Sequence, residues 1–533
     1  MNGVIRPLPY EPGTSGGYMK RGRSSRPLLS AGTITAAVAL LAGMNLANAQ
    51  APAPAPPLSG AGSFPLSFIV PGTNTSLHVG GFVQFDARYQ MSSFGGSTSP
   101  GADYNIYPGA VALEGNGVGT AAGHSLHGTL YMTAQSSRVQ LETRTPSAYG
   151  EVKTFIEFDF SGSASASGTA GLTNTSTGAT QEPSNFLDLP RLKQAYGTLG
   201  PFAIGQFSSN YADLAAWPDG IFGAAAAGIP DGPGTAFVPQ VRYTYLLPQG
   251  ISVSGSAEYN DTGGYIGTSN GASPLAGGAP GVPAGQAPSF NDYNAPGVGG
   301  KFPAFTATAQ VQQPWGHAAF HVVAANTYLR NMGGVLGGAL GAAGAGSTPP
   351  AGFPPGGHIE RWGFQTALTG HINTIGRDKI TFNAEYGQGA DSYAWDMQNL
   401  GLQTIEDLVC SLNGPTTATS QAIACSQARN VGGNLQYVHF WNDQWRSAVD
   451  VGYATISRPN AAATWIATTP SNAGVSNVLT DLERRHVTAF AYTGWTPVAG
   501  VQFGLEYEWW LRQVWSGAHG NANQISFQSL FAF

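Results

Sequence analysis

The chain has 533 residues, a formal net charge of −6 and charged residues at only 10% of positions, against roughly 25% in an average soluble domain. Its 74 glycines and 36 prolines argue against a helical protein, and its 11% of aromatic residues argues against a disordered one. With 23 basic and 29 acidic residues it has no basic surplus, so we expect no nucleic-acid partner.

Residues 1–49 have the pattern of a cleaved export signal. Four basic residues between positions 20 and 26 precede an apolar stretch, and Ala47-Asn48-Ala49 supplies the small residues that signal peptidase requires. The alternative is an uncleaved membrane anchor, and Met19 is an alternative start to Met1. An Ala/Pro-rich periplasmic linker is expected at 50–75, followed by the main domain at 76–533.

From residue 76 onward, apolar and polar residues alternate with a period of two, which is typical of strands with one apolar and one polar face. In the segment 77–90, for example, the odd positions are mostly apolar and the even positions carry most of the polar groups. The same alternation recurs at 138–144, 151–160, 240–245, 251–260, 379–386 and 501–509.

Short Pro/Gly turns alternate strictly with long links rich in Gly, Ser, Thr and Ala. The short turns lie at 145–148, 199–201, 247–250, 313–316, 374–377, 442–443 and 497–500. The long links lie at 92–135, 161–190, 207–238, 261–300, 329–357, 389–432, 458–481 and 513–522. This order predicts an all-β fold, a transmembrane antiparallel β-barrel of about 16 strands with long external loops and short periplasmic turns, as in the bacterial outer membrane.

The last strand and the aromatic residues agree with a barrel. Apolar residues alternate from Ile525 to a terminal Phe533, which resembles the strand that the barrel-insertion machinery reads, so we expect that machinery as a partner. Outward-facing rings near strand ends would form an interfacial girdle against outer-membrane lipid. The candidates are Tyr89, Phe160, Tyr245, Tyr259, Tyr386, Tyr507 and Trp509.

Several strand motifs resemble the DcaP-like family of trimeric outer-membrane porins. They lie at 80–87 (GGFVQFDA), 137–146, 149–154, 191–197, 205–206 and 239–244. The resemblance implies a homotrimer of 16-stranded barrels that passes small, mostly anionic organic solutes such as dicarboxylates. The family's N-terminal coiled-coil segment has no evident counterpart here, where only the Ala/Pro linker stands.

The polar face of the first six predicted strands carries seven basic residues. They are Arg88, Arg138, Arg144, Lys153, Arg191, Lys193 and Arg242. The polar face of a barrel lines its lumen, so neighbouring strands would gather these cations into a ladder suited to carboxylates and phosphates. Acidic residues share the same face, namely Asp86, Glu142, Glu151, Glu157 and Asp159. The alternative is therefore a set of inward ion pairs that only keeps the lumen hydrated and ordered.

The link 207–238 is the candidate constriction loop. We expect it to fold into the lumen, where Asp213 and Asp219 would face the basic ladder and narrow the path. The alternative is an ordinary external loop.

The two cysteines, Cys410 and Cys425, lie in one long link with 14 residues between them. In an exported protein a disulfide between them is the expected state. Two cysteines alone make no zinc site, and no nucleophile elbow, phosphate loop or dinucleotide fingerprint is present, so we expect no metal, no cofactor and no enzymatic activity.

The expected function is passive diffusion of small hydrophilic, preferably anionic, solutes through an outer-membrane porin. A sugar-selective porin and a non-conducting surface or structural barrel of the adhesin type are the alternatives.

Overall fold

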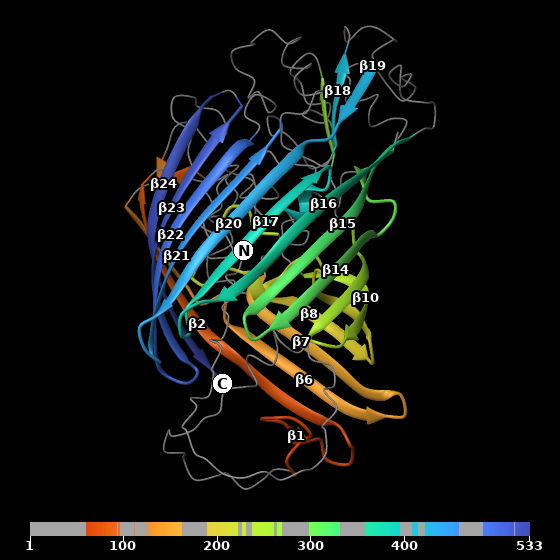
Figure 1. The fold of residues 1–533 in the computed structure, drawn as a ribbon, viewed down its shortest axis with the longest axis vertical. Helices are drawn as coiled ribbons and strands as arrows, with labels where there is room; N and C mark the ends of the chain where they lie inside the picture. The colour runs from red at the N-terminus through yellow and green to blue at the C-terminus, as the bar shows by residue number, and fades with distance from the viewer. Residues whose placement is uncertain are drawn as a thin grey trace, which may run out of the picture.

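The segments with a period of two form long antiparallel strands in the computed structural model of the protein (Figure 1). The structure describes residues 60–92, 94–95, 111, 125–126, 128–162, 189–221, 226–230, 237–260, 264–268, 298–330, 358–394, 408–413, 422–457, 483–515 and 517–533. The expected export signal at 1–49 and the first part of the expected linker lie outside the described residues.

The strands close into a 16-stranded antiparallel barrel, which confirms the predicted fold class. Around the barrel they are β2 (Ser76–Ser92), β5 (Thr129–Thr133) continued by β6 (Arg138–Ser147), β7 (Gly150–Gly162), β8 (Leu189–Leu199), β9 (Phe202–Ser208), β10 (Phe237–Leu247), β11 (Ile251–Glu258), β14 (Ala304–Gln313), β15 (Gly316–Arg330), β16 (His358–Asn373), β17 (Lys379–Gln388), β20 (Arg429–Phe440), β21 (Trp445–Ile456), β22 (Glu483–Val498), β23 (Val501–Val514) and β24 (His519–Ala532). The first and last strands, β2 and β24, pair with each other, with Gln84 opposite Leu530, so the sheet has no free edge.

The two ends of the barrel differ as the link lengths predict. The predicted short turns all join neighbouring strands at one end, and the long links leave from the other. The remaining short strands are β1 (Phe68–Ile69), β3 (Phe94–Gly95), β4 (Ser125–Leu126), β12 (Gly264–Thr268), β13 (Val298–Gly299), β18 (Leu408–Asn413) and β19 (Ala422–Ser426). Figure 1 shows β18 and β19 beyond the long-link end and β1 beyond the short-turn end.

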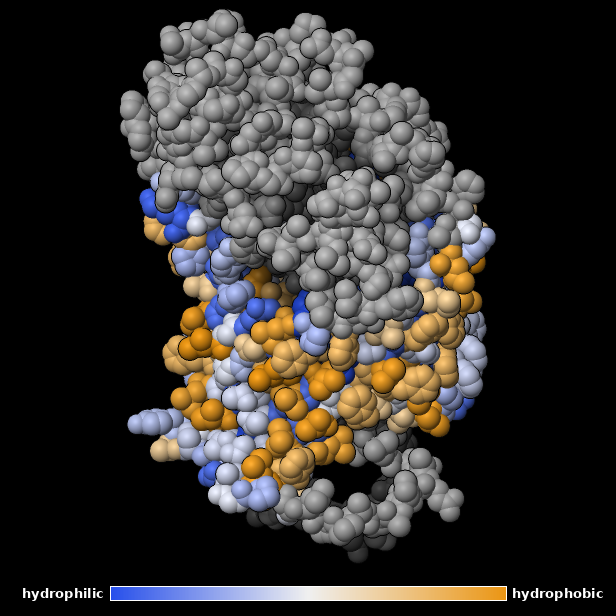
Figure 2. Space-filling model, turned by 180° about the vertical axis from the view of Figure 1, so that it is seen from behind, coloured by the Kyte–Doolittle hydropathy of each residue, from blue (hydrophilic) through white to orange (hydrophobic). Residues whose placement is uncertain are grey.

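Side chains alternate between the two faces of the wall as the period of two requires. On β2, Val83 and Tyr89 are exposed on the outside, whereas Gln84 and Arg88 are buried on the inside. Figure 2 shows the result on one side of the molecule, where a broad apolar band covers the outer surface of the strands. No helix among the described residues is long and apolar enough to cross a membrane.

Aromatic side chains gather on the outside near the strand ends. All five tyrosines expected in the girdle are exposed, and Phe160 and Trp509 are half-buried. At the short-turn end, the Trp495 ring stacks between Trp445 and Phe503, with centroids 5.7 Å and 5.6 Å away. Rings in this position suit the headgroup level of a bilayer, where an apolar ring with a polar edge is favoured.

The end of the expected linker is folded against the barrel. Residues 60–75 include β1, which pairs with the start of β2. The Arg144 guanidinium lies 4.4 Å from the centroid of the Phe64 ring, and the His78 Nδ1 lies 3.1 Å from the Leu66 carbonyl oxygen. These contacts form because the segment places an aromatic ring, Phe64, and a backbone carbonyl, that of Leu66, beside the inward-facing residues Arg144 and His78.

A cluster of hydrogen bonds around Asp378 joins one short turn to the neighbouring hairpin. Asp378 accepts hydrogen bonds from the Tyr437 hydroxyl at 2.6 Å and the Phe440 backbone N–H at 2.8 Å, and its Oδ2 lies 2.7 Å from His439 Nδ1. Burial raises the pKa of Asp378, but these hydrogen bonds and the His439 charge outweigh it and lower the pKa to about 2.

This cluster predicts a loss of stability in acid. The pKa of Asp378 is depressed in the folded protein, so its contribution is fully present above the unfolded-state pKa of about 3.9 and disappears as the pH falls through the folded value. We expect Asp378→Asn to unfold at a lower temperature than wild type at pH 5 and the difference to shrink toward pH 2. The measurement is the temperature at which the heat-modifiable gel band shifts. An equal difference at both pH values would contradict the assignment.

Candidate functional site: the barrel lumen

The link between β9 and β10 lies inside the barrel in the part that the structure describes. Its described part, residues 209–221 and 226–230, is called the inner segment below. It contacts inward-facing side chains of strands from β11 to β23, which we call the anchoring wall. The seven predicted cations lie on β2, β6, β7, β8 and β10, which we call the basic wall.

The inner segment begins with two donors to one buried carboxylate. Glu258, which is 1% exposed, accepts hydrogen bonds from Ser209 Oγ and the Asn210 backbone N–H, both at 2.7 Å. The Asn210 carbonyl oxygen in turn accepts a hydrogen bond of 2.6 Å from Thr308 Oγ1. The start of the segment is therefore fixed to β11 and β14.

Asp213 is the next anchor. Its Oδ2 accepts a hydrogen bond of 2.5 Å from Thr369 Oγ1 and lies 2.9 Å from His317 Nε2, while its Oδ1 accepts from the Ala215 backbone N–H. Burial raises the pKa of Asp213, but the charges and hydrogen bonds of His317, the His321 charge and the Thr369 hydroxyl outweigh it and hold the pKa well below its usual range. Asp213 is thus a carboxylate that caps a short 3-10 turn and joins it to β15 and β16.

Asp219 forms a bidentate ion pair with Arg446 of β21. Arg446 Nε donates to Asp219 Oδ2 at 2.7 Å and Nη2 donates to Oδ1 at 3.1 Å. Gln436 holds the same residue through its backbone, accepting from the Asp219 N–H at 2.7 Å and donating to its carbonyl oxygen at 2.8 Å. A fork of two parallel hydrogen bonds fixes both distance and orientation.

The later part of the segment lies flat on the anchoring wall. The backbone N–H groups of Ile221 and Ala227 donate to Glu506 Oε2 at 2.6 Å and Thr488 Oγ1 at 3.0 Å. Gly228 has a φ of +77°, and a Cβ there would lie 2.1 Å from the backbone nitrogen of Gly433. Two glycines facing each other allow the two backbones to approach this closely.

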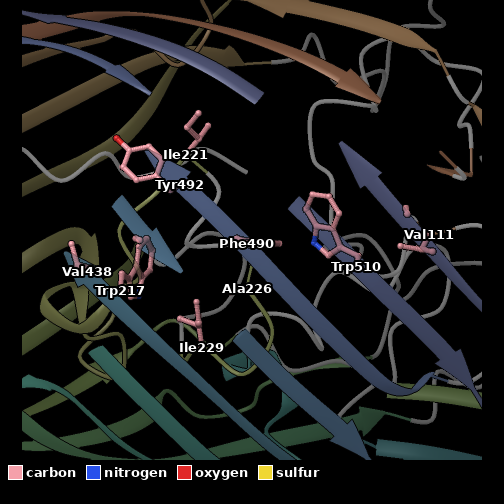
Figure 3. Packing of buried hydrophobic residues seen from close by; sticks show 11 residues of the cluster. Val111, Trp217, Ile221, Ala226, Ile229, Val438, Phe490, Tyr492 and Trp510 are labelled. Atoms are coloured by element: carbon pink, nitrogen blue, oxygen red, sulfur yellow. The ribbon is translucent and has the colours of Figure 1, made fainter. Parts of the chain in front are cut away.

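Apolar side chains complete the attachment. Trp217, Ile221 and Ile229 of the inner segment pack with residues of the wall in one buried cluster (Figure 3). In the same cluster the Phe490 and Trp510 rings meet edge to face with centroids 5.2 Å apart. A buried apolar contact inside a lumen adds to the polar anchors because it removes ring surface from water.

The basic wall is held by ion pairs within itself. Six contacts of 2.6–3.6 Å join the cations to acidic residues of the same wall. They are Arg138–Glu157, Arg144–Glu142, Arg144–Glu151, Lys153–Glu142, Arg191–Asp159 and Lys193–Asp159. Arg242 differs, since it donates to Gln240 Oε1 and the Ser208 carbonyl oxygen and stacks on the Phe207 ring. Arg88 lies on the same inner face.

The structure differs from the sequence expectation for Asp213 and Asp219. We expected both to face the basic wall, and both instead bind residues of the anchoring wall, His317 and Arg446. The physical reason is desolvation, since a carboxylate inside the barrel must be paired, and five of the seven cations of the basic wall already have acidic partners.

Sequence reasoning did not identify the anchors of the inner segment. Arg446 and His317 lie on the inward face of their strands, like the predicted cations. The alternation of polar and apolar residues is the one sequence signal that could have identified them as inward-facing. Inward aromatic residues were also missed, and Phe155, Tyr196 and Phe207 form a buried cluster on the basic wall.

The predicted disulfide lies outside the barrel wall. The register of β18 and β19 places Cys410 opposite Cys425, and Cys425 is disulfide-bonded. Among the described residues, no group of three or more His, Cys, Asp or Glu side chains could hold a metal ion.

Comparisons with known proteins place the chain in a family. The family model described as the porin subfamily matches residues 62–529. The outer membrane channel DcaP of Acinetobacter baumannii has a similar structure, with a TM-score of 0.57 and 18% identity over 89% of this chain and 100% of that chain. An anion-selective porin from Comamonas acidovorans gives a TM-score of 0.44 and 8% identity over 86% of this chain and 100% of that chain. No curated protein matches. The chain belongs to the porin subfamily, and its location is the bacterial outer membrane.

Proposed function

We propose that this porin favours small hydrophilic anions, which diffuse passively through a lumen narrowed by the inner segment. The observation that carries the proposal is an asymmetry within the ion pairs of the basic wall. In the Arg191–Asp159 pair, 32% of the arginine side chain is exposed and 0% of the aspartate. In the Arg144–Glu142 pair the values are 22% and 4%. In these two pairs the cation is the more exposed partner, whereas in the Arg144–Glu151 pair the order is reversed, with 22% and 47%. The proposal rests on the pairs in which the carboxylate is covered.

The anchoring wall supports the same preference. Its carboxylates are covered by donors of the inner segment, as with Glu258 and Glu506, each 1% exposed. The donors of the inner segment that cover these carboxylates offset part of their negative charge, so less of it acts on an ion in the lumen. The result is a lumen with cationic groups on its accessible side.

A sugar-selective lumen is less favoured by the aromatic residues of the basic wall. Phe155, Tyr196 and Phe207 pack on one another, with centroid distances of 5.6 Å and 4.9 Å, and are 4%, 7% and 2% exposed. Rings that are buried in this way present no open face on which a sugar could stack.

The function is tested by single-channel recording of the purified protein in planar bilayers under a salt gradient. We expect stepwise conductance with a reversal potential biased toward anions. A bias toward cations would overturn the anion preference and leave a porin, whereas no conductance at all would favour the structural barrel.

The resemblance to trimeric porins extends the proposal to a homotrimer. We also propose that the disulfide stiffens the external hairpin of β18 and β19, and that the insertion machinery recognises the C-terminal strand. The mass of the assembly in neutral detergent, measured by light scattering with the contribution of the detergent subtracted, tests whether the protein is a trimer. A monomeric mass would overturn it.

A further inference from the structure

The outer face of β20–β24 is polar at one end and aromatic at the other. The strand register places Val431, Thr455, Arg485, Gln513 and His519 side by side in one row at the long-link end. Arg485 and His519 in that row are exposed. At the short-turn end, the corresponding row carries the stacked Trp445 and Trp495 rings.

The distance between the two rows matches the thickness of a membrane. On β22, Arg485 and Trp495 are ten residues apart, which at about 3.4 Å per residue is roughly 34 Å along the strand. A strand tilt of about 40° reduces this to roughly 26 Å across the membrane, close to the ~25 Å apolar band of such barrels. Exposed Leu435, Val449 and Val451 fill the space between the rows. The arginine row therefore lies at the edge of the external leaflet.

Two more arginines extend this row. Arg429 on β20 is exposed, faces outward like Val431, and donates to Gln388 Oε1 at 3.4 Å. Arg484 is exposed and lies with its guanidinium carbon 5.0 Å from the centroid of the Trp515 ring. Among the residues whose side chains the structure describes, a set that leaves out Glu483, no carboxylate pairs with Arg429, Arg484 or Arg485.

The short-turn end of the same face is different. The arginine at the neighbouring short turn between β16 and β17, Arg377, is half-buried, is paired with Asp443 at 2.9 Å and stacks on the Phe440 ring. Guanidinium groups without a carboxylate partner among the described side chains thus occur at the external edge of this face, above an apolar surface, whereas the arginine at the short turns beside it is paired. This difference suits a membrane whose two leaflets present different headgroups.

We propose that Arg429, Arg484 and Arg485 form a binding site for the phosphate groups of a lipid in the external leaflet, with its acyl chains on the apolar rows below. A guanidinium group binds phosphate through a planar fork of donors, and arginines at headgroup level with no carboxylate partner among the described side chains hold such a charge without breaking an ion pair. The apolar rows of β20–β22 supply the second part of the recognition, which a free phosphate ion could not use.

The test uses the delipidated full chain in a neutral detergent with three probes. They are a diphosphorylated glucosamine-disaccharide lipid, the same lipid without phosphates, and inorganic phosphate. Native mass spectrometry measures the bound lipid. We expect removal of the lipid phosphates to weaken binding by about tenfold or more, since charge-assisted hydrogen bonds to phosphate are lost. Equal binding of the two lipids would overturn the proposal, and this comparison needs no variant.

Variants locate the site. We expect R429Q/R485Q to bind the diphosphorylated lipid about tenfold more weakly, and R429K/R485K, which keeps the charge without the fork, to lose less. The control is R377Q, in the short turn between β16 and β17 at the opposite end of the barrel, which should bind as wild type. R485Q alone provides a second variant if the double variant does not give the heat-modifiable folded band.

The same samples distinguish the lipid from two other occupants of this surface, a soluble anion and a second copy of the chain. Complete displacement of the lipid by millimolar inorganic phosphate would indicate a site for soluble anions and overturn the lipid assignment. A change of assembly mass in R429Q/R485Q with unchanged lipid binding would indicate a contact between copies of the chain and would also overturn it.

Discussion

Asp219→Ala is expected to widen the channel, raising its single-channel conductance and its current noise. The substitution removes the partner of Arg446. The Asp219 side chain is 12% exposed and the Arg446 side chain 3%. Losing one partner of a buried ion pair costs about 3–5 kcal/mol, because the other charge is left desolvated. The middle of the inner segment would then be held to the anchoring wall by the Gln436 hydrogen bonds to its backbone and the apolar contacts of Trp217, without an ion pair, and would leave the wall more often.

The measurement is conductance in planar bilayers, with folding checked by the heat-modifiable gel band. The control is Asp443→Ala, which removes the acid of the Arg377 pair, where the aspartate side chain is 99% exposed. Such a surface pair joins two short turns and is worth about 0–1 kcal/mol, so the conductance of the variant should equal that of wild type. If folded Asp219→Ala conducts as wild type, the inner segment does not limit the path.

Replacing Arg138 and Arg191 by Gln is expected to shift the reversal potential toward cations. Each substitution removes a positive charge from the basic wall and leaves its acidic partner, Glu157 or Asp159, in place. A unit charge about 4 Å from an ion is worth about 1 kcal/mol in water, so two charges change the anion-to-cation permeability ratio by roughly tenfold or more.

The control for this experiment is Arg429→Gln, which removes one positive charge from the exposed outer face of β20. It should leave the reversal potential unchanged, and Arg191→Gln alone should give a larger shift than Arg138→Gln alone, because Arg191 is the more exposed of the two. An unchanged reversal potential in the double variant would mean that the basic wall does not set selectivity.

The fold could be predicted because it depends on local patterns. The period of two places Val83 and Gln84 on opposite faces, and turn chemistry at 145–148 or 497–500 fixes where strands reverse. Neither inference requires knowledge of distant residues. The strand count follows from the number of turns.

The lumen could be predicted only in part. Parity identified which residues face inward, including Arg138 and Arg191, but it does not say which residues meet across a barrel. The pairing of Asp219 with Arg446 joins positions 227 residues apart, and nothing in the local sequence of either residue marks the other. The covered state of Glu258 and Glu506 depends on the same long-range packing.

The anchors of the inner segment also constrain the order in which the chain assembles. The Ile221 N–H reaches Glu506 across 285 residues of sequence, so this contact can form only after the last strands have been placed. Closing so long a loop is entropically unfavourable and slow. In β-sheet proteins, contacts between residues far apart in the sequence therefore form late in folding. The segment would therefore settle in its final position near the end of folding, and a barrel that has just closed would conduct more freely than the mature one.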